Sequence, residues 1–540
     1  MTKKTFIVVL VALGLATASQ GQKFTEQDTL RGSITPERAW WDLNFYHLDI
    51  AVDPANKFLS GSNTIRYTVL EESQILQIDL QPPLIIEKVM QDGKKLSFKS
   101  NTNAHFITLK KRQKKGDTNE IVVYYSGHPK EAVNAPWDGG FSWKTDANGK
   151  TFAATSCQGL GASVWWPNKD HMYDEVDSMA ISVKVPKGLM NVSNGRLRRV
   201  DKATNTYHWY VSNPINNYGV NVNIADYVHF GEQFKGEKGQ LDMDYYVLPD
   251  DLEKAKEHFK DAPKMMQAFE HWFGPYPFYE DGFKLVQVPY LGMEHQSSVT
   301  YGNQFMQGYL GRDLSDTGWG LKFDFIIIHE AGHEWFANNI TYKDIADMWI
   351  HEGFTCYSES LFLDYHYGTK AANEYVIGLR PGIRNDRPII GQYDVNYEGS
   401  GDMYSKASNM LHTLRQLVNN DEKWRKILRG LNKDFYHQTV TTEQIEGYLT
   451  TKTGINLSPF FDQYLRTTKI PVLEYSVDGN SIRYRYTNVV GGFEMPVRIS
   501  TATGDQWLMP GSDWKREAFK GDPANLVIDP NFYITVKTLP

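Results

Sequence analysis

Two histidines and a glutamate stand at a spacing that could hold a metal ion and activate water. His329, Glu330 and His333 form the pattern H-E-x-x-H directly after the apolar run 325–328. Residues four apart lie on one face of a helix, so both imidazoles can reach one ion about 2.0–2.1 Å away. Glu330 is then angled toward a water beside the ion. The pattern predicts the zinc site of a metallopeptidase, although five residues alone also match by chance.

Catalytic zinc takes three protein ligands and keeps one position open, so a third ligand is needed. Glu352 lies in the segment WIHEGF, with eighteen residues between it and His333. A helix that ends at 338–339, followed by an antiparallel helix beginning near Glu352, would return this carboxylate to the imidazoles. Alone, Glu352 could instead be a glutamate favoured by a helix N-terminus. Gly332 costs about 1 kcal/mol relative to alanine, which indicates that a backbone or a ligand approaches closely there.

These residues resemble the signature of the zinc aminopeptidases of metallopeptidase family M1, which includes aminopeptidase N and leukotriene hydrolase. The signature is H-E-x-x-H, eighteen residues and a glutamate, and the sequence matches it. The resemblance implies one Zn²⁺ per chain, bound by His329, His333 and Glu352, with Glu330 as the general base. His351 departs from the asparagine that usually precedes the third ligand, and this change can alter the hydrogen bonds around the metal.

A second segment resembles the family's G-x-M-E-N strand edge, along which a peptide can lie in extended form. It consists of Gly292, Met293, Glu294 and His295. In the family this glutamate binds the free α-ammonium of the substrate, and Glu294 matches it. Beside an internal peptide bond such a carboxylate would stay buried and unpaired, so it selects for a free N-terminus. His295 replaces the usual asparagine, which leaves open how the substrate backbone is held and how activity depends on pH.

Two further site residues follow from the resemblance alone. Gln158, in the segment TSCQG, matches a glutamine that reaches into the site from the β domain and contacts the first residue of the substrate. Tyr404, in DMYSKA, resembles the tyrosine of the family's Y-x-K-G and would donate a hydrogen bond to the developing oxyanion. A phenol with a pKa of about 10 stays protonated at neutral pH, which suits this role.

The combined pattern implies a zinc-dependent aminopeptidase that hydrolyses the N-terminal peptide bond of peptide substrates with a free N-terminus. Three alternatives stay open. A secreted endopeptidase could use the same zinc helix, and it would cleave N-terminally blocked peptides. Epoxide hydrolysis, known for leukotriene hydrolase, shares the motifs but has no specific support in the sequence. A catalytically silent peptide-binding protein is the third alternative, and the full set of catalytic side chains argues against it.

Composition excludes other classes of partner. The formal net charge is −7, and no basic patch is large enough to neutralise many phosphates, so we expect no nucleic-acid partner. The only basic cluster, at 110–115, precedes Gly116-Asp117 and is expected at a solvated hairpin tip. Two cysteines, Cys157 and Cys356, cannot form a cysteine-rich zinc site, and we expect both to be buried free thiols. The oligomeric state is not indicated.

The first residues resemble a secretory signal peptide. Lys3 and Lys4 precede an apolar stretch at 6–16, and Ala16-Thr17-Ala18 provides small residues for cleavage. Eleven apolar residues are too few for a mature transmembrane helix, which needs about twenty. We therefore expect a protein that is exported, to the periplasm or the medium, and that has no membrane contact after cleavage.

The predicted fold class is multidomain α+β. Strand-like runs with turns fill about 40–235, helical patterns dominate from Asp250 to about 465, and strands return after 471. One helix is expected from Asp250 to Gly274, because apolar residues recur there at three-to-four spacing. With the resemblance, we expect a signal peptide at 1–18, an all-β saddle-like domain at 19–236, a thermolysin-like, mainly helical zinc domain at 237–470, and a small β-sandwich-like domain at 471–540.

Overall fold

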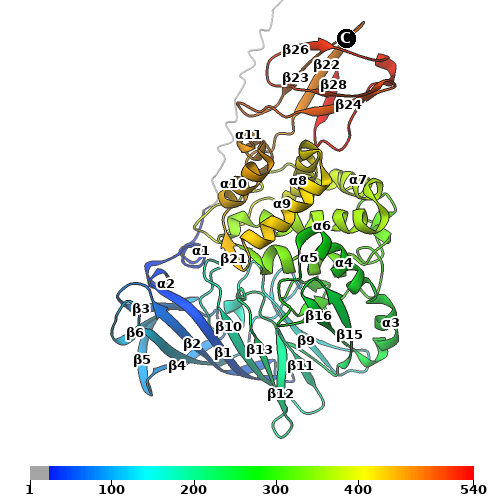
Figure 1. The fold of residues 1–540 in the computed structure, drawn as a ribbon. Helices are drawn as coiled ribbons and strands as arrows, with labels where there is room; N and C mark the ends of the chain where they lie inside the picture. Colours follow the sequence, from blue (N-terminus) through cyan, green and yellow to red (C-terminus); the bar gives the residue numbers. More distant parts are fainter. Residues whose placement is uncertain (1–22) are drawn as a thin grey trace, which may run out of the picture.

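The computed structural model describes residues 23–540, which form three stacked regions (Figure 1). A broad β-rich region lies at one end, helices fill the middle, and a small β region carries the C-terminus. This arrangement confirms the predicted α+β class. The chain enters through two short helices, α1 (Glu26–Gly32) and α2 (Pro36–Ala39). The predicted signal peptide lies outside the described residues. None of the helices in 23–540 combines the length and hydropathy that a bilayer crossing requires.

The N-terminal region consists of two β-sheets. The larger sheet has ten strands in the order β12-β13-β10-β1-β2-β7-β4-β5-β6-β3; β1 and β10 are parallel, and its other pairs are antiparallel. Its strands are β1 (Trp41–Asp53), β2 (Phe58–Val69), β3 (Ser73–Asp79), β4 (Ile85–Gln91), β5 (Lys94–Asn101), β6 (Ala104–Gln113), β7 (Thr118–Gly127), β10 (Ser178–Lys184), β12 (Arg196–Asp201) and β13 (Thr206–Val211). The smaller sheet contains β8 (Gly140–Thr145), β9 (Thr151–Ser156), β11 (Met190–Val192) and β14 (Asn223–Ala225). The basic run 110–115 comprises the end of β6 and the start of its connection to β7. These two strands are not paired with each other, so the predicted hairpin is wrong.

A five-stranded sheet joins the β region to the helices, in the order β15-β16-β17-β19-β18. Its strands are β15 (Val228–Gly236), β16 (Gly239–Val247), β17 (Phe283–Gln287), β18 (Gly292–Met293) and β19 (Val299–Tyr301). The domain change predicted after residue 236 falls inside the β15–β16 hairpin, and β16 also pairs with β17. This sheet therefore begins at Val228. The sequence pattern of β15 resembles that of the preceding strands. Only its pairing with β16 assigns it to the five-stranded sheet.

The middle region is helical, with α3 (Leu252–His258), α4 (Asp261–Phe273), α5 (Phe325–Gly332), α6 (Trp349–Tyr367), α7 (Thr369–Gly378), α8 (Ser405–Val418), α9 (Asp421–Asp434), α10 (Thr442–Thr453) and α11 (Ser458–Leu465). Strands β20 (Ile340–Tyr342) and β21 (Gln438–Val440) pair beside them. The single helix predicted from Asp250 is wrong, because it is divided into α3 and α4. Pro263 is the reason: its ring would clash with the carbonyl of Phe259 in a continuous helix, and α3 ends at that point.

Two small sheets form the C-terminal region. One contains β22 (Val472–Asp478), β23 (Ser481–Thr487), β26 (Lys515–Ala518) and β28 (Thr535–Thr538), and the other contains β24 (Val497–Thr501), β25 (Gly504–Leu508) and β27 (Val527–Ile528). Tyr464 of α11 donates a hydrogen bond to the carbonyl of Tyr533 at 2.7 Å, and its ring lies near Phe493. The apolar core of the helices continues into these sheets without interruption.

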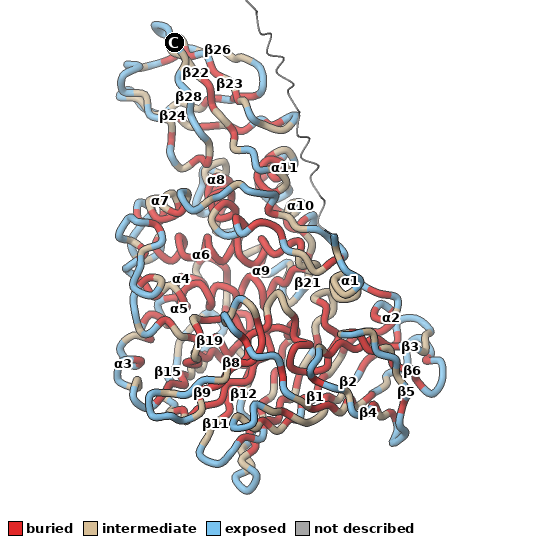
Figure 2. The backbone as a smooth tube through the Cα atoms, turned by 180° about the vertical axis from the view of Figure 1, so that it is seen from behind, coloured by how far each residue is buried: buried red, intermediate tan, exposed pale blue. Residues whose placement is uncertain are grey.

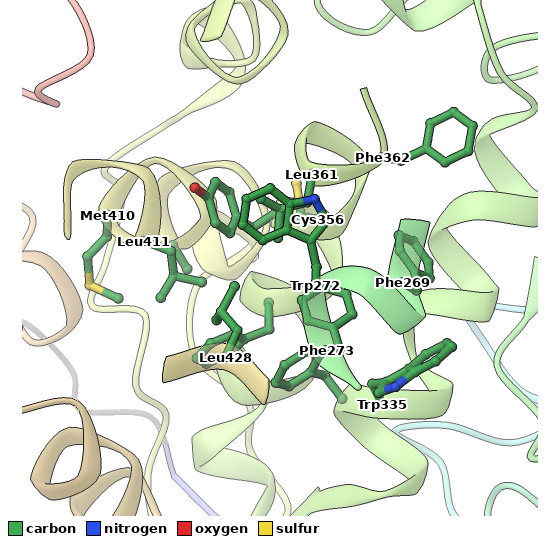
Figure 3. Close-up of a cluster of buried hydrophobic side chains, with 14 of the residues drawn as sticks. Phe269, Trp272, Phe273, Trp335, Cys356, Leu361, Phe362, Met410, Leu411 and Leu428 are labelled. Carbon is green, nitrogen blue, oxygen red and sulfur yellow. The ribbon is translucent and has the colours of Figure 1, made fainter. Parts of the chain in front are cut away.

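The helices that carry the H-E-x-x-H motif and Glu352 are fixed by a dense core. Residues 349–363 of α6 are all buried, so this helix runs through the interior instead of along the surface (Figure 2). Its apolar side chains pack with aromatic and aliphatic side chains of α4, α8 and α9 (Figure 3). Cys356 lies in this cluster, and Cys157 is buried in the β region; both are free thiols, as predicted.

Candidate metal and amino-terminus site

His329 projects from α5, a short helix that begins at a capped residue, and His333 is the residue that ends this helix. The Asp324 carboxylate accepts a hydrogen bond from the backbone N–H of Ile327 at 3.1 Å, which satisfies one of the free amides at the helix start. The imidazoles of His329 and His333 lie one turn apart, with ring centroids separated by 5.0 Å. Both rings are buried. The chain leaves the helix at 334–338 and returns through β20 to α6.

Glu352, in the first turn of α6, completes the predicted ligand set. Its Oε2 atom lies 3.6 Å from Nε2 of His329 and 3.4 Å from Nε2 of His333. Gly332 permits this approach of the two helices, because a Cβ atom there would lie 2.7 Å from the Oγ atom of Ser358. The close contact expected at Gly332 is thus a contact between α5 and α6.

In each imidazole, the nitrogen that faces away from Glu352, Nδ1, has a hydrogen-bond acceptor, and this contact fixes the tautomer. Nδ1 of His329 donates to the Glu359 carboxylate at 2.8 Å, and Nδ1 of His333 donates to the carbonyl of Phe336 at 3.0 Å. Both Nε2 lone pairs therefore point toward Glu352, whose buried Oε2 receives no hydrogen bond from any residue in 23–540. A cation between these three groups would be bound by all of them. The donor set fits tetrahedral Zn²⁺ with one open position.

Glu330 lies beside this ligand set without joining it. Its carboxylate, an imidazole nitrogen of His333 and the carboxylate of Glu294 lie within 4.8 Å of one another. Burial raises the pKa of Glu330 to about 7, and the charge of Glu294 acts in the same direction. A carboxylate with a pKa near neutrality can both accept and return a proton, as a general base must.

Glu294 and Gln158 meet although 136 positions separate them in the chain. The Gln158 side-chain amide donates to Oε1 of Glu294 at 2.7 Å, and the Tyr218 hydroxyl donates to the same oxygen at 3.1 Å. Gln158 follows β9 and Tyr218 precedes β14, so both donors come from the β region. Glu294 itself follows β18, in the five-stranded sheet.

The strand β18, formed by Gly292 and Met293, is the last strand of its sheet. Both residues line the site, as expected of a substrate-binding edge. A side chain at Gly292 would collide with Ile326 of α5, since its Cβ atom would lie 2.5 Å from Cγ2 of Ile326. The glycine therefore lets the edge strand pack directly on the helix that carries the metal-binding pattern.

The side chain of His295 faces away from the site cavity, and the predicted contribution of this residue to substrate binding stays a prediction. Its side chain is fully buried, it does not line the site cavity, and its ring contacts Thr300 Oγ1 at 3.3 Å. Burial lowers its pKa to about 3, so the ring is neutral at ordinary pH. Successive residues of an extended chain face opposite sides, and Glu294 takes the side that faces the cavity. The pH effect considered for this position therefore has no basis in its surroundings.

Tyr404 precedes α8 and lies at the opening of the site. Its ring centroid is 6.1 Å from that of His329, and 38% of its surface is exposed. It lines a cavity of about 390 Å³ together with Gln158, Glu294 and the zinc-binding group. A neighbouring, mainly apolar cavity of about 260 Å³ shares His329, Glu330 and Tyr404 with it.

Comparison with known proteins identifies the family of this chain. The family model described as the peptidase M1 N-terminal domain matches residues 43–218, and the peptidase family M1 domain matches residues 257–464. The chain belongs to metallopeptidase family M1. Its members bind one catalytic zinc ion, and the ligand geometry described above fits that ion.

Several relatives in family M1 are similar to most of this chain. Leukotriene A-4 hydrolase of Xenopus laevis is 23% identical over 77% of this chain and 68% of its own length. Probable aminopeptidase 2 of Sulfurisphaera tokodaii is 21% identical over 81% of this chain, but only 55% of that relative is matched. Aminopeptidase M1-B of rice is matched over 35% of its length, so this chain spans only part of some relatives. A solved M1 zinc metallopeptidase from Deinococcus radiodurans has the same fold, with a TM-score of 0.67 at 18% identity over 81% of this chain and 95% of that one.

Sequence reasoning missed three residues of the M1 site. Glu359 was detectable, because it follows Glu352 by seven residues and therefore lies two turns along the same face of α6. Tyr218 had no local signal among 31 tyrosines. Trp137, which is 63% exposed and lines both site cavities, lies in a loop with no readable pattern.

Proposed function

We propose that this chain is a zinc-dependent aminopeptidase that removes the first residue of peptides with a free N-terminus. One observation carries the proposal. His329, His333 and Glu352 converge on a common point, and the buried carboxylate of Glu294 lies within the same cavity. The first group suits a cation and the second suits a substrate ammonium. Relatives named aminopeptidases and the family membership support the same activity.

The metal ligands and the general base have separate roles in the proposed reaction. His329, His333 and Glu352 would hold Zn²⁺, which would supply Lewis acidity toward the scissile carbonyl and a neighbouring water. Glu330 removes a proton from the attacking water and passes it to the leaving amine.

Tyr404 and Glu294 bind two different parts of the substrate. The neutral hydroxyl of Tyr404 donates to the oxygen that gains charge during the attack. Desolvation of the hydroxyl and the charge of Glu352 raise the pKa of Tyr404 further above its usual value, so the phenol keeps its proton. Glu294 binds the α-ammonium, so the first peptide bond is the one that reaches Glu330.

The arrangement favours an aminopeptidase over an endopeptidase. Glu294 is 3% exposed, and an internal peptide bond would leave its charge buried without a cationic partner. Of the solved neighbours, the Deinococcus radiodurans protein is described in complex with a Tyr-Ser-Ala substrate, a short peptide. A short peptide with a charged N-terminus is the class of substrate that the anchor in this chain would select.

The test is hydrolysis of an aminoacyl-aminomethylcoumarin panel by purified protein, with and without a chelator. We expect turnover of free-amine substrates, its loss on chelation, and its return on addition of one equivalent of Zn²⁺. Absence of turnover in protein that contains one zinc per chain would contradict the proposal.

We also propose that the protein is exported. Lys3 and Lys4, the apolar stretch at 6–16 and the small residues at 16–18 support this. Expression of the full chain followed by fractionation and N-terminal sequencing tests it. We expect mature protein outside the cytoplasm that begins near residue 19, and full-length protein confined to the cytoplasm would contradict export.

A further inference from the structure

The carboxylate of Glu294 is held asymmetrically. Gln158 and Tyr218 both donate to Oε1, at 2.7 and 3.1 Å. No residue in 23–540 donates a hydrogen bond to Oε2. This oxygen is accessible from the cavity that Glu294 lines. One oxygen is therefore occupied by the protein, and the other is free to receive a ligand.

Tyr218 is itself oriented by His351, the residue that departs from the usual asparagine. Nε2 of His351 lies 2.8 Å from the backbone N–H of Tyr342, and Nδ1 lies 3.4 Å from the Tyr218 hydroxyl. A backbone N–H can only donate, so Nε2 accepts and Nδ1 carries the ring proton. Nδ1–H then donates to the oxygen of Tyr218, and the hydroxyl proton of Tyr218 is directed to Glu294.

The surroundings hold this chain of hydrogen bonds in place. The ring of His351 stacks on Tyr342, with centroids 4.1 Å apart. The backbone carbonyl of Glu294 accepts a hydrogen bond from the Asn338 side chain at 2.9 Å. Tyr218, Glu294 and His351 are all buried, so water does not compete for these bonds.

We propose that His351 and Tyr218 are positioning residues that set the selectivity of the site for a free amine. Tyr218, oriented by His351, donates to Oε1 of Glu294 beside Gln158, and these contacts leave Oε2 directed at the α-ammonium of the substrate. This role rests on the proposed aminopeptidase function and adds the residues that enforce it. His351 also links the anchor to the metal, because the next residue is Glu352.

The position of Nε2 distinguishes histidine from asparagine here. An asparagine amide has atoms equivalent to Nδ1 and Cδ2, but none at the position of Nε2. His351→Asn therefore keeps a donor for Tyr218 and leaves the N–H of Tyr342 without an acceptor. His351→Leu removes both contacts in a side chain of similar apolar bulk. The two variants thus separate the positioning role from a purely structural one.

The experiment measures how much the substrate amine contributes to binding. Inhibition constants are determined for L-leucine hydroxamate and for 4-methylpentanohydroxamate, which lacks only the amine. The proteins are wild type, Tyr218→Phe, His351→Leu and His351→Asn. Tyr227→Phe is the matched control, because Tyr227 is buried and donates to the carbonyl of Gln287, away from the site. Zinc content and melting temperature are recorded for each.

We expect the wild type to prefer the amine-bearing inhibitor by about 10- to 150-fold, the range of a hydrogen bond between charged groups. Tyr218→Phe and His351→Leu should reduce this ratio by about three- to tenfold, with unchanged zinc content and unchanged inhibition by the des-amino compound. His351→Asn should keep the ratio but melt at a lower temperature, and Tyr227→Phe should keep the ratio.

Two results would overturn the proposal in different ways. If the wild type shows the preference and both Tyr218→Phe and His351→Leu retain it, the positioning role is wrong while the aminopeptidase function stands. If the wild type binds both hydroxamates equally, the amine is not recognised, and the proposed function fails together with the positioning role.

Discussion

The two halves of the site are built in different ways. The zinc half comes from one stretch of chain, in which α5 and α6 present His329, His333 and Glu352. The anchor half combines Gln158 and Tyr218 from the β region with Glu294 from the five-stranded sheet. The first half is fixed by the core within the helical region, and the second depends on how the β region packs against it. Changes in the zinc half should therefore affect the chemistry, and changes in the anchor half should affect selection.

The largest effect should come from the zinc half, with Glu330→Gln. The amide keeps the size of the side chain but cannot accept the proton of water, so kcat should fall by about 10²–10⁴-fold. The substitution does not touch a ligand, so one zinc per chain should remain. Steady-state kinetics and elemental analysis measure both quantities. Activity within a few-fold of wild type would show that Glu330 is not the base.

Tyr404→Phe should have the next largest effect, about 10²–10³-fold in kcat. The ring and its packing stay in place, and only the donor to the developing oxyanion is lost. KM should change little, because this hydrogen bond strengthens as charge develops. A rise in KM with kcat unchanged would place Tyr404 in ordinary substrate binding instead.

Glu359→Gln should weaken zinc binding by about 10–100-fold, because Glu359 accepts the Nδ1 proton of His329. Competition with a fluorescent chelator measures the affinity. Glu374→Gln is the matched control, since Glu374 accepts a hydrogen bond from Trp319, away from the metal site. Equal zinc affinity in both variants would show that the Glu359 contact does not tune the metal.

The smallest effect should come from Glu398→Gln, at the wall of the substrate cavity. Glu398 is exposed and forms no ion pair within 4 Å among residues 23–540, so its charge is available to a cationic side chain. We expect kcat/KM for arginyl and lysyl substrates to fall about two- to fivefold relative to leucyl substrates, as for an exposed ion pair. An unchanged ratio would show that Glu398 does not contribute to first-residue preference.

The difference between the zinc half and the anchor half also explains how much of the site could be predicted from the sequence. Helical spacing alone brings His329 and His333 together, and the return of Glu352 follows from a connection that leads back to a second helix. Local spacing contains no information about Tyr218, which meets Glu294 only through packing between regions 76 positions apart in the chain. The break between α3 and α4 was readable from Pro263, whereas the β15–β16 hairpin was not assignable before its pairing partners were known. His295 shows that an adjacent residue in a motif can face away from the site.

The central claim is that zinc and Glu294 together restrict this chain to the first peptide bond. The most direct test supplies zinc-loaded protein with the tripeptide Leu-Gly-Phe and with its N-acetylated form, and identifies the products by mass spectrometry. We expect free leucine and Gly-Phe from the first peptide, and no cleavage of the second. Cleavage of the acetylated peptide at a comparable rate would contradict the account.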